Sequence, residues 1–388
     1  MSSLTWVPLG EIAEVISGQS PESKHYNNEA QGLPFYQGKK DFGAKFIDEP
    51  TVWTSMPTKI AHSGDILMSV RAPVGPVNIA TQECCIGRGL AAIRPDLSKI
   101  SLDYLFHFLQ SIQGSLEGSQ GSVFDSINGK QIREIRIPLR SQTEQLELVD
   151  KLDKAHAVLD AYESLERQKQ KESSSLFGAL LESTFQEIIA QYPLRPTSEI
   201  LDVRDGTHDS PKFQKDGYPF VTSKNLKNGE LDFSNVKYIS KDDFEEYNKR
   251  SKVGRGDLLF GMIGTIGNPV VVGETPEFAI KNVALVKANS NYDLNFLRYY
   301  YLCPSIKRAI VDGTKGTTQK FVGLGNLRAF RSPDAPIEVQ KKALEKFTQG
   351  ESSLKKLEVV YAQKFKAIEE LRNSVCVSLF GNRVLDVE

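Results

Sequence analysis

The sequence predicts an α/β (α+β) protein in which two similar mixed α/β domains alternate with two long helices. Three observations predict this fold class: a repeated order of short motifs, short apolar runs bounded by Gly, Pro and Asp, and two long segments nearly free of Gly and Pro. A chain of 388 residues is too long for one ordinary core. We expect pseudo-twofold symmetry, with domains at 1–140 and 191–335 and helices at 141–190 and 336–388.

The internal repeat is visible as motifs that return in the same order. The segment GDILM at 64–68 returns as GDLLF at 256–260, and IRIP at 135–138 returns as FRSP at 330–333. Both halves also close alike, with SLFG at 175–178 and again at 378–381. Two similar domains at a set spacing suit an extended, repetitive ligand.

Within each domain, short apolar runs predict strands and one amphipathic segment predicts a helix. The runs are bounded by Gly, Pro and Asp, as strands are, and the helical segments repeat apolar residues at a spacing of three and four. The predicted strands are 66–70, 90–93, 258–260 and 270–272, and the predicted helices are 102–112 and 294–302.

The two long segments carry the seam of a coiled coil. A helix of about 40 residues, roughly 60 Å long, needs a partner for its apolar stripe. We expect the two helices to pair antiparallel within the chain, the alternative being a dimer between chains. A capping box, Ser141 with Glu144, opens the first helix. The predicted seam weakens near Glu166 and resumes at Leu176; its residues are Leu148, Leu152, Leu159, Tyr162, Phe347, Leu354, Leu357, Tyr361, Ile368 and Val375.

Composition limits the classes of function. The net charge of −1 is mildly unfavourable for a free-standing nucleic-acid binder, although residues 191–335 carry a basic excess and 141–190 an acidic one. No apolar stretch is long enough to span a bilayer, and the N-terminus lacks a secretion signal, so we expect a cytoplasmic protein. The four cysteines form no C-x-x-C pair and are interpreted as reduced, buried thiols.

Motifs for catalysis are missing from the sequence. It has no phosphate-binding loop ending in Lys-Ser or Lys-Thr, no Asn-Pro-Pro-aromatic segment, and no histidines at metal-ligand spacing. His208 beside Asp209 is interpreted as part of a polar loop, and Glu22 with Lys24 as a chance match to a nuclease site. We therefore expect no catalytic and no metal-binding residue in this chain.

The order and duplication of the motifs resemble the specificity (S) subunit of bacterial type I restriction-modification enzymes. The resemblance covers nearly the whole chain, and its second copy is partly eroded, with Asp205-Gly206 in place of Ser-Gly. The motifs that carry it are 9–13 (LGEIA), 17–21 (SGQSP), 64–67 (GDIL), 135–139 (IRIPL), 143–145 (TEQ) and 336–340 (PIEVQ).

The resemblance implies that each domain is a target-recognition domain that reads one half of a bipartite, asymmetric double-stranded DNA sequence. The helices would set the spacing and dock two methyltransferase (modification) subunits, with restriction/translocase subunits joining them. This chain would bind no cofactor and would not be an enzyme alone. It would be part of a type I site-specific deoxyribonuclease and adenine-specific DNA methyltransferase complex, whose partner subunits use S-adenosylmethionine, ATP and Mg²⁺.

Candidate DNA-binding residues are polar and lie on predicted loops, where Lys and Arg can hold phosphates and the others can reach base edges. The basic cluster 248–252 is either a further contact or an ordinary solvated surface. The alternatives for function are a specificity module of another bacterial DNA-modification system and a two-domain protein-binding scaffold. The candidates are Ser20, Lys24, Tyr36, Lys39, Lys40, Arg71, Ser119, Gln120, Ser122, Thr207, His208, Lys212, Ser223, Lys224, Asn225, Thr314, Lys315, Thr317, Thr318, Gln319 and Lys320.

Overall fold

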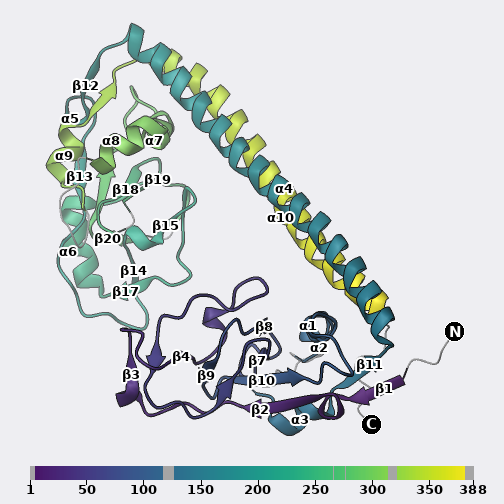
Figure 1. The fold of residues 1–388 in the computed structure, drawn as a ribbon. Helices are drawn as coiled ribbons and strands as arrows, with labels where there is room; N and C mark the ends of the chain where they lie inside the picture. Colours follow the sequence, from purple (N-terminus) through teal and green to yellow (C-terminus); the bar gives the residue numbers. More distant parts are fainter. Residues whose placement is uncertain (1–4, 117–125, 265, 276, 313–320, 381–388) are drawn as a thin grey trace. The chain divides into compact units, whose positions relative to one another are not determined.

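The structure is a computed structural model that describes residues 5–116, 126–264, 266–275, 277–312 and 321–380. The chain forms two compact units, the first made of Met1–Leu165 with Gln363–Glu388 and the second of Glu166–Ala362. Each unit contains one mixed α/β domain and one end of each of two long helices, α4 (Gln142–Gln191) and α10 (Ile337–Phe380) (Figure 1).

The domain of the first unit is built on a four-stranded antiparallel sheet in the order β2-β10-β7-β8, a five-stranded sheet in the order β3-β5-β4-β9-β6, and the pair β1-β11. Its strands are β1 (Thr5–Pro8), β2 (Ala13–Ser17), β3 (Tyr26–Asn27), β4 (Leu33–Tyr36), β5 (Trp53–Thr54), β6 (Ile60–Ala61), β7 (Ile66–Ser69), β8 (Val77–Ile79), β9 (Cys84–Ile86), β10 (Leu90–Pro95) and β11 (Arg136–Leu139). Its helices are α1 (Leu102–Ser111), α2 (Gln113–Leu116) and α3 (Gly129–Glu134), with 3-10 turns η1 (Leu9–Glu11), η2 (Ser23–His25) and η3 (Lys39–Asp41).

The domain of the second unit repeats this plan, with sheets β13-β21-β18-β19, β17-β14-β20, β15-β16 and β12-β22. Its strands are β12 (Leu194–Pro196), β13 (Val203–Asp205), β14 (Tyr218–Val221), β15 (Leu226–Lys227), β16 (Glu230–Leu231), β17 (Lys237–Ile239), β18 (Leu258–Gly261), β19 (Gly267–Val271), β20 (Ala279–Ile280), β21 (Val283–Val286) and β22 (Arg331–Pro333). Its helices are α5 (Thr197–Ile200), α6 (Lys241–Ser251), α7 (Leu294–Leu302), α8 (Pro304–Asp312) and α9 (Leu324–Ala329), with the 3-10 turn η4 (Ser223–Asn225).

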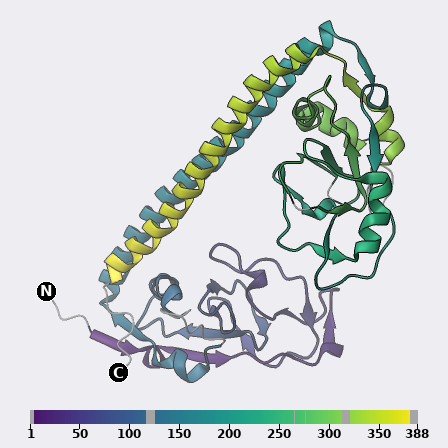
Figure 2. The same ribbon diagram turned by 180° about the vertical axis from the view of Figure 1, so that it is seen from behind.

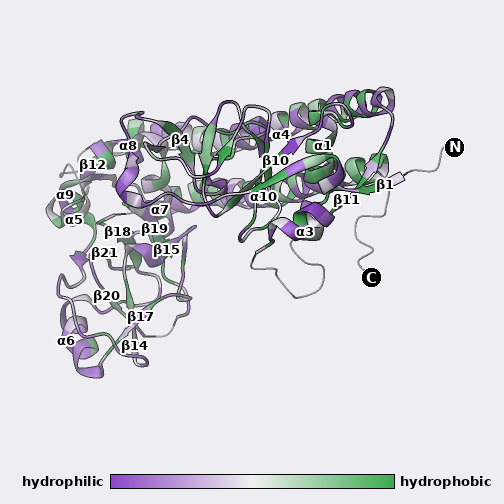
Figure 3. Cartoon of the chain, turned by 60° about the horizontal axis from the view of Figure 1, so that its bottom comes forward, coloured by the Kyte–Doolittle hydropathy of each residue, from purple (hydrophilic) through white to green (hydrophobic). Residues whose placement is uncertain are grey.

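The central strands of each domain are buried on both faces, which explains their continuous apolar runs. Every residue of β7 is buried, and so is every residue of β18. One face of the first sheet packs on α1 and the start of α4, in a core that contains Met68, Ile93 and Phe108. Figure 3 shows β10 largely in the colour of hydrophobic residues.

The repeated Gly-Asp motif has one structural explanation in both domains. Gly64 and Gly256 have φ of +88° and +84°, a conformation that favours glycine. The Asp that follows is buried and accepts a hydrogen bond from a backbone N–H three residues back, at 2.8 Å for Asp65 and 2.7 Å for Asp257. A basic side chain neutralises each carboxylate, Arg94 at 2.8 Å in the first domain and a lysine at the matching place in the second.

The two long helices pair antiparallel, as predicted. In the first unit, Leu148 and Leu152 near the start of α4 share a core with Phe380 at the end of α10. In the second unit, the end of α4 shares a core with the start of α10, through Phe185 and Phe347, whose rings lie 5.1 Å apart. The helices run side by side in both views (Figures 1 and 2), so the pairing is intramolecular.

The seam follows a slightly different path from the predicted one. Tyr162 and Leu357 were placed in it, but they keep 43% and 41% of their surface exposed, and Leu176 keeps 72%. Glu166, predicted as a weak point, is 1% exposed and accepts a hydrogen bond from Lys169 at 2.9 Å. An α-helix drifts relative to a strict heptad repeat, which moves the buried stripe by one residue. The other predicted seam residues are buried or half-buried: Leu148, Leu152, Leu159, Phe347, Leu354, Tyr361, Ile368 and Val375.

The predicted capping box precedes α4. The Ser141 hydroxyl accepts a hydrogen bond from Glu144 N at 3.3 Å, and the Glu144 carboxylate accepts one from Ser141 N at 3.0 Å. These hydrogen bonds to Ser141 lower the pKa of Glu144 below its ordinary value. The box therefore gives two backbone N–H groups at the helix start a partner.

Candidate nucleic-acid interface

In the first unit, three loops meet at one end of the strands that carry them. They are the loop after β2 (18–21), the loop after β4 (37–41) and the turn between β9 and β10 (87–89), which we call together the first loop cluster. Backbone hydrogen bonds hold the three loops against one another and against the end of β7. The bonds run from Gly18 N to Leu90 O (2.9 Å), Gln19 N to Ile86 O (2.9 Å), Gly87 N to Tyr36 O (2.8 Å) and Val70 N to Gly89 O (3.0 Å).

The second unit has the same three loops with the same backbone hydrogen bonds. They are the loop after β13 (206–211), the turn after β14 (222–225) and the turn between β20 and β21 (281–282), which we call the second loop cluster. Each bond matches one in the first cluster, so the internal repeat extends to the loops. The bonds run from Gly206 N to Val283 O (2.9 Å), Thr207 N to Ile280 O (3.1 Å), Lys281 N to Val221 O (2.9 Å) and Met262 N to Asn282 O (3.4 Å).

One glycine in each cluster allows the loops to approach this closely. A Cβ on Gly18 would overlap the carbonyl oxygens of Gly87 and Leu90, and a Cβ on Gly206 would overlap that of Ile280. Because the clashing atoms belong to the backbone, a larger residue would push the loops apart. The Ser-Gly and Asp-Gly positions found in the sequence are therefore sites where backbone packs against backbone.

The side chains on this shared frame differ between the two clusters. The first cluster presents Gln19, Gln37 and Arg88, all exposed. In the second cluster, His208 Nδ1 lies 2.6 Å from Asn282 Oδ1, and His208 Nε2 lies 3.2 Å from a carboxylate oxygen of Asp205. Amide, guanidinium and imidazole groups are the ones that proteins use to read base edges. Two identical frames with different polar side chains suit two different binding sequences.

Comparison with known proteins identifies the family. Residues 2–172 and 195–359 match the type I restriction modification DNA specificity domain, once in each half of the chain. The chain belongs to the type I restriction modification DNA specificity family. This confirms the resemblance that the motifs predicted.

Individual relatives agree with the family match. A putative type I restriction enzyme MjaX specificity subunit of Methanocaldococcus jannaschii is 38% identical over 169 residues, which are 43% of this chain and 40% of that protein. The type I restriction enzyme MjaIX specificity subunit of the same organism is 24% identical over 362 residues, which are 82% of this chain and 80% of that protein. A chain from a solved structure on complex assembly and conformational transition of the type I R-M system has the same fold, with a TM-score of 0.68, 17% identity and 98% coverage of both chains.

Several residues predicted to bind DNA in this specificity protein lie in or beside the first loop cluster. Ser20 accepts a hydrogen bond from Arg88 N at 3.3 Å, and Lys39 and Lys40 are exposed on η3. Arg71 is exposed at the end of β7, whereas Lys24 lies on η2 and is paired with a neighbouring glutamate at 2.6 Å. The cluster therefore contains three of these five side chains and lies beside a fourth, Arg71.

The prediction for Tyr36 is wrong. It was predicted to contact DNA, but its side chain is 1% exposed and its hydroxyl donates a hydrogen bond to Asp48 O at 2.9 Å. Burial raises the pKa of the Tyr36 hydroxyl well above its ordinary value. Tyr36 ends a short strand, and a pattern-based prediction does not distinguish the last inward residue of a strand from the first outward residue of the loop.

In the second loop cluster, Thr207 and His208 lie in the loop after β13, and Lys224 is exposed on the turn after β14. Lys212 is exposed one residue beyond the cluster. Ser223 and Asn225 are buried, so the prediction that they contact DNA is wrong. Ser223 Oγ donates to Asn282 O at 3.3 Å, and the Asn225 amide closes a capping box with Thr222. Their polar groups hold the turn after β14 in place. The predicted contacts Ser119, Gln120, Ser122, Thr314, Lys315, Thr317, Thr318, Gln319 and Lys320 lie outside the described residues.

Sequence reasoning missed several exposed or half-exposed polar residues of the clusters. Gln19, Gln37, Arg88 and Lys281 are examples in the interlocked loops. A signal was available for Arg88, because the run CCIGRGLAAI at 84–93 is two apolar strands separated by Gly-Arg-Gly. Such a run predicts a tight turn with one outward side chain.

The cations of the basic cluster at 248–252 are paired with carboxylates. Lys249 pairs with Glu246 at 2.6 Å, Arg250 pairs with Asp205, and Lys252 pairs with Glu277 at 3.9 Å. Each cation of the cluster thus has its own carboxylate. This leaves little free positive charge for phosphate.

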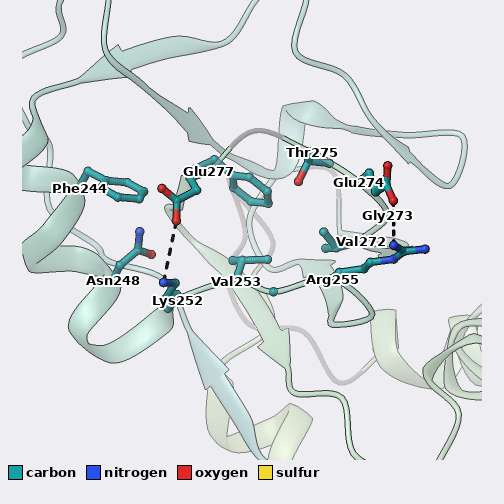
Figure 4. Close-up of a pocket in the computed structure, with 12 residues that line it drawn as sticks. Phe244, Asn248, Lys252, Val253, Arg255, Val272, Gly273, Glu274, Thr275 and Glu277 are labelled. Carbon is teal, nitrogen blue, oxygen red and sulfur yellow. Dashed lines mark hydrogen bonds and ion pairs between the residues drawn. The ribbon is translucent and has the colours of Figure 1, made fainter.

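A pocket of about 250 Å³ lies next to this surface, between the end of α6 and the segment that follows β19 (Figure 4). Two ion pairs cross its rim, Lys252 with Glu277 and Arg255 with Glu274, the second at 2.8 Å. The pocket lies at the start of β18 and the second loop cluster at its end, so the pocket is separate from the candidate interface.

Within the described ranges, no group of three His, Cys, Asp or Glu side chains is arranged to hold a metal ion. In the same ranges, no helix is both long enough and apolar enough to cross a membrane. The four cysteines are all buried and unpaired, and burial raises the pKa of the Cys84 thiol to about 12.

Proposed function

We propose that this chain is the DNA sequence-recognition subunit of a type I restriction-modification complex, in which each loop cluster reads one half of a bipartite double-stranded target. The observation that carries the proposal is the pair of matching backbone frames with different side chains. Because Arg88 in one frame has no counterpart in the other, whose turn between β20 and β21 is one residue shorter, the two halves of the target differ in sequence. The target is therefore asymmetric.

The paired helices would set the number of unread base pairs between the halves. A coiled coil is stiff, whereas a flexible linker of similar length would allow many separations. The seam supports this role, because α4 and α10 pack together in both units. Each domain is also anchored to a long helix through its own core, so a change in helix length is transmitted to the domain.

The helices also offer surface for two modification subunits. Val158 and Leu165 in the first unit, and Leu176 and Val359 in the second, are between 46% and 72% exposed on the outer faces of the pair. We propose that the modification subunits cover these exposed apolar side chains. In the proposed complex, S-adenosylmethionine, ATP and Mg²⁺ are used by the modification and restriction/translocase subunits, and this chain supplies sequence recognition without a cofactor.

The test replaces one domain and determines which DNA sequence the resulting complex recognises. Residues 1–140 are replaced with the equivalent domain of another member of the family, and the complex with its modification subunits is used to methylate genomic DNA. Sequencing of methylated adenines should show one half of the target changed, with the other half and the spacer retained. The reciprocal exchange of residues 191–335 is the matched control and should change only the other half.

Two results would count against the proposal. A change in both halves after one exchange would show that the domains do not read DNA independently. An assembled complex with no sequence preference would favour the protein-binding scaffold instead, and an unrelated methylation pattern would favour another DNA-modification system.

A further inference from the structure

Arg88 is presented on the turn at the centre of the first loop cluster. Its side chain is exposed, and its guanidinium makes no hydrogen bond or ion pair with any other described residue. In the same domain, Arg94 pairs with Asp65 and Arg133 donates to Val15 O. Arg88 thus differs from the arginines that stabilise the fold, because its exposed guanidinium has no hydrogen-bond or ion-pair partner among the described residues.

The backbone around Arg88 is fixed by neighbouring loops. Gly87 and Gly89 on either side are buried, and a Cβ on either would press on Gln37 of the loop after β4. Arg88 N donates to Ser20 Oγ at 3.3 Å, which ties the turn to the loop after β2. The Cα of Arg88 is therefore held by both neighbouring loops, and only the side chain is free to move.

Two amide side chains lie on the loops that flank Arg88. Gln19 and Gln37 are exposed there, and among the described residues no ion pair joins a carboxylate to Arg88. A guanidinium without a competing acid keeps its parallel N–H groups available for a ligand with two acceptors. On DNA, O6 and N7 of guanine form such a pair in the major groove.

The corresponding turn in the second cluster is one residue shorter and is arranged differently. Its backbone bonds place Lys281 opposite Gly87 and Asn282 opposite Gly89, and the Asn282 side-chain oxygen is 2.6 Å from His208 Nδ1. The neighbouring Lys281 donates to Ser210 Oγ at 2.5 Å. The second turn therefore uses its polar groups to hold its own loops, whereas the first turn leaves an arginine free.

We propose that Arg88 determines specificity in the half-site that the first domain reads, by donating two hydrogen bonds to O6 and N7 of one guanine. This inference rests on the proposed function and names the chemistry of one contact within it. Lys39 and Lys40, which project from η3 beside the turn, neutralise phosphates and carry no sequence preference.

The experiment uses the full chain assembled with its modification subunits and the target found by methylation sequencing. Each guanine of the first half-site is replaced in turn by 7-deazaguanine, which lacks the N7 acceptor, or by inosine, which keeps N7 and O6. At one guanine, 7-deazaguanine should weaken binding by the wild-type complex about fivefold or more, while inosine has little effect.

The variants identify the partner of that guanine. Arg88→Ala should bind the unmodified target about five- to a hundredfold more weakly and should no longer respond to 7-deazaguanine at that position. Arg88→Lys keeps the charge but lacks the paired donors, so it should retain affinity for random DNA and lose discrimination at that base pair. Lys39→Ala is the matched control and should weaken binding equally on all sequences, with a shallower salt dependence.

Three results would overturn the inference. The first is a half-site of the first domain that contains no guanine, and the second is an Arg88→Ala complex that stays sensitive to 7-deazaguanine. The third is an equal loss of affinity of Arg88→Ala for target and random DNA, which would indicate a phosphate contact. Thermal unfolding of Arg88→Ala should match that of the wild type, because the exposed side chain makes no hydrogen bond or ion pair with a described residue. If the wild-type complex itself showed no sequence preference, the proposed function would fail rather than this assignment.

Discussion

Gln145 and Gln340 occupy the same place in the two units. Each is fully buried near the start of a long helix, and each side-chain oxygen accepts a hydrogen bond at 2.8 Å from the N-cap residue of a domain helix, Ser101 before α1 and Asp293 before α7. Each amide nitrogen donates back to the chain entering its own helix, at 2.9 Å to Arg140 O and 2.7 Å to Ala335 O. The glutamine of the repeated motif thus joins each domain to the coiled coil.

Removing either glutamine should destabilise its own unit. Gln145→Ala and Gln340→Ala each leave a buried N–H without a partner, which costs about 1–3 kcal/mol. Unfolding in urea, followed by circular dichroism, should show both losses, and the double variant should show their sum because the sites share no partner. Gln349→Ala, at an exposed position on α10, is the control; an equal effect there would contradict the assigned role.

The glycines of the loop clusters should be required for DNA recognition. Gly18→Ala should disturb the first cluster and Gly206→Ala the second, each with a cost of about 1–3 kcal/mol from overlap with backbone. Binding assays on target variants should show discrimination lost in one half-site at a time. Gly114→Ala and Gly273→Ala, which lie outside the loop clusters and where a Cβ meets no atom within 4 Å, are the matched controls and should behave like the wild type.

The ion pair between Arg298 and Glu351 should make stability depend on pH. It joins α7 to α10 at 2.5 Å, and the Tyr299 hydroxyl donates to the same carboxylate at 2.6 Å. Burial alone would raise the pKa of Glu351, but the hydrogen bonds from Arg298 and Tyr299 outweigh it and hold the pKa below its ordinary 4.5. Because the folded state holds this proton less tightly than the unfolded chain, the pair stabilises above that pH, and its contribution is lost as the pH falls.

Glu351→Gln should therefore lower the free energy of unfolding by about 2 kcal/mol at pH 7 and by less near pH 3. The measurement is urea unfolding between pH 3 and pH 7. Glu345→Gln, on an exposed position of α10, is the matched control and should leave the pH dependence unchanged. A constant difference between Glu351→Gln and the wild type across this range would refute the charge-based explanation.

Lengthening the coiled coil should lengthen the unread spacer. A heptad added to α4 alone would break the antiparallel seam, so heptads are inserted between Leu165 and Glu166 and between Ala362 and Gln363, where both helices pass from one unit to the other. Seven residues add about 10 Å of helix, close to the rise of three base pairs. Methylation sequencing should show a spacer about three base pairs longer with unchanged half-sites; an unchanged spacer would disprove the ruler role.

Charge on the outer faces of the helices should prevent assembly with the modification subunits. Val158→Glu in the first unit and Leu176→Glu in the second replace side chains that are 69% and 72% exposed, so the chain should fold normally. Co-purification with the modification subunits should fall for both variants. Leu97→Glu, equally exposed on a domain loop, is the control, and equal loss there would argue against docking on the helices.

Much of the fold could be predicted because the signals are local. Gly64 and Gly256 occupy a turn that favours glycine, and the Asp after each accepts a backbone hydrogen bond within three residues. The spacing of apolar residues along 141–190 likewise indicates which face of the helix is buried, whatever that face packs against. Such patterns depend on neighbours in the chain, so the sequence alone indicated two repeated domains, two long helices and their order.

Only the tertiary structure decided which polar residues are exposed on the candidate interface. Tyr36 and Ser223 looked like loop contacts but are buried, and their hydroxyls donate to carbonyls on other segments, Asp48 O and Asn282 O. Arg88 became prominent only because its turn packs between two other loops. The seam leaves Tyr162 exposed for a related reason, since helix drift and the partner helix together set the buried face. Exposure results from contacts between distant segments, and short-range spacing does not contain that information.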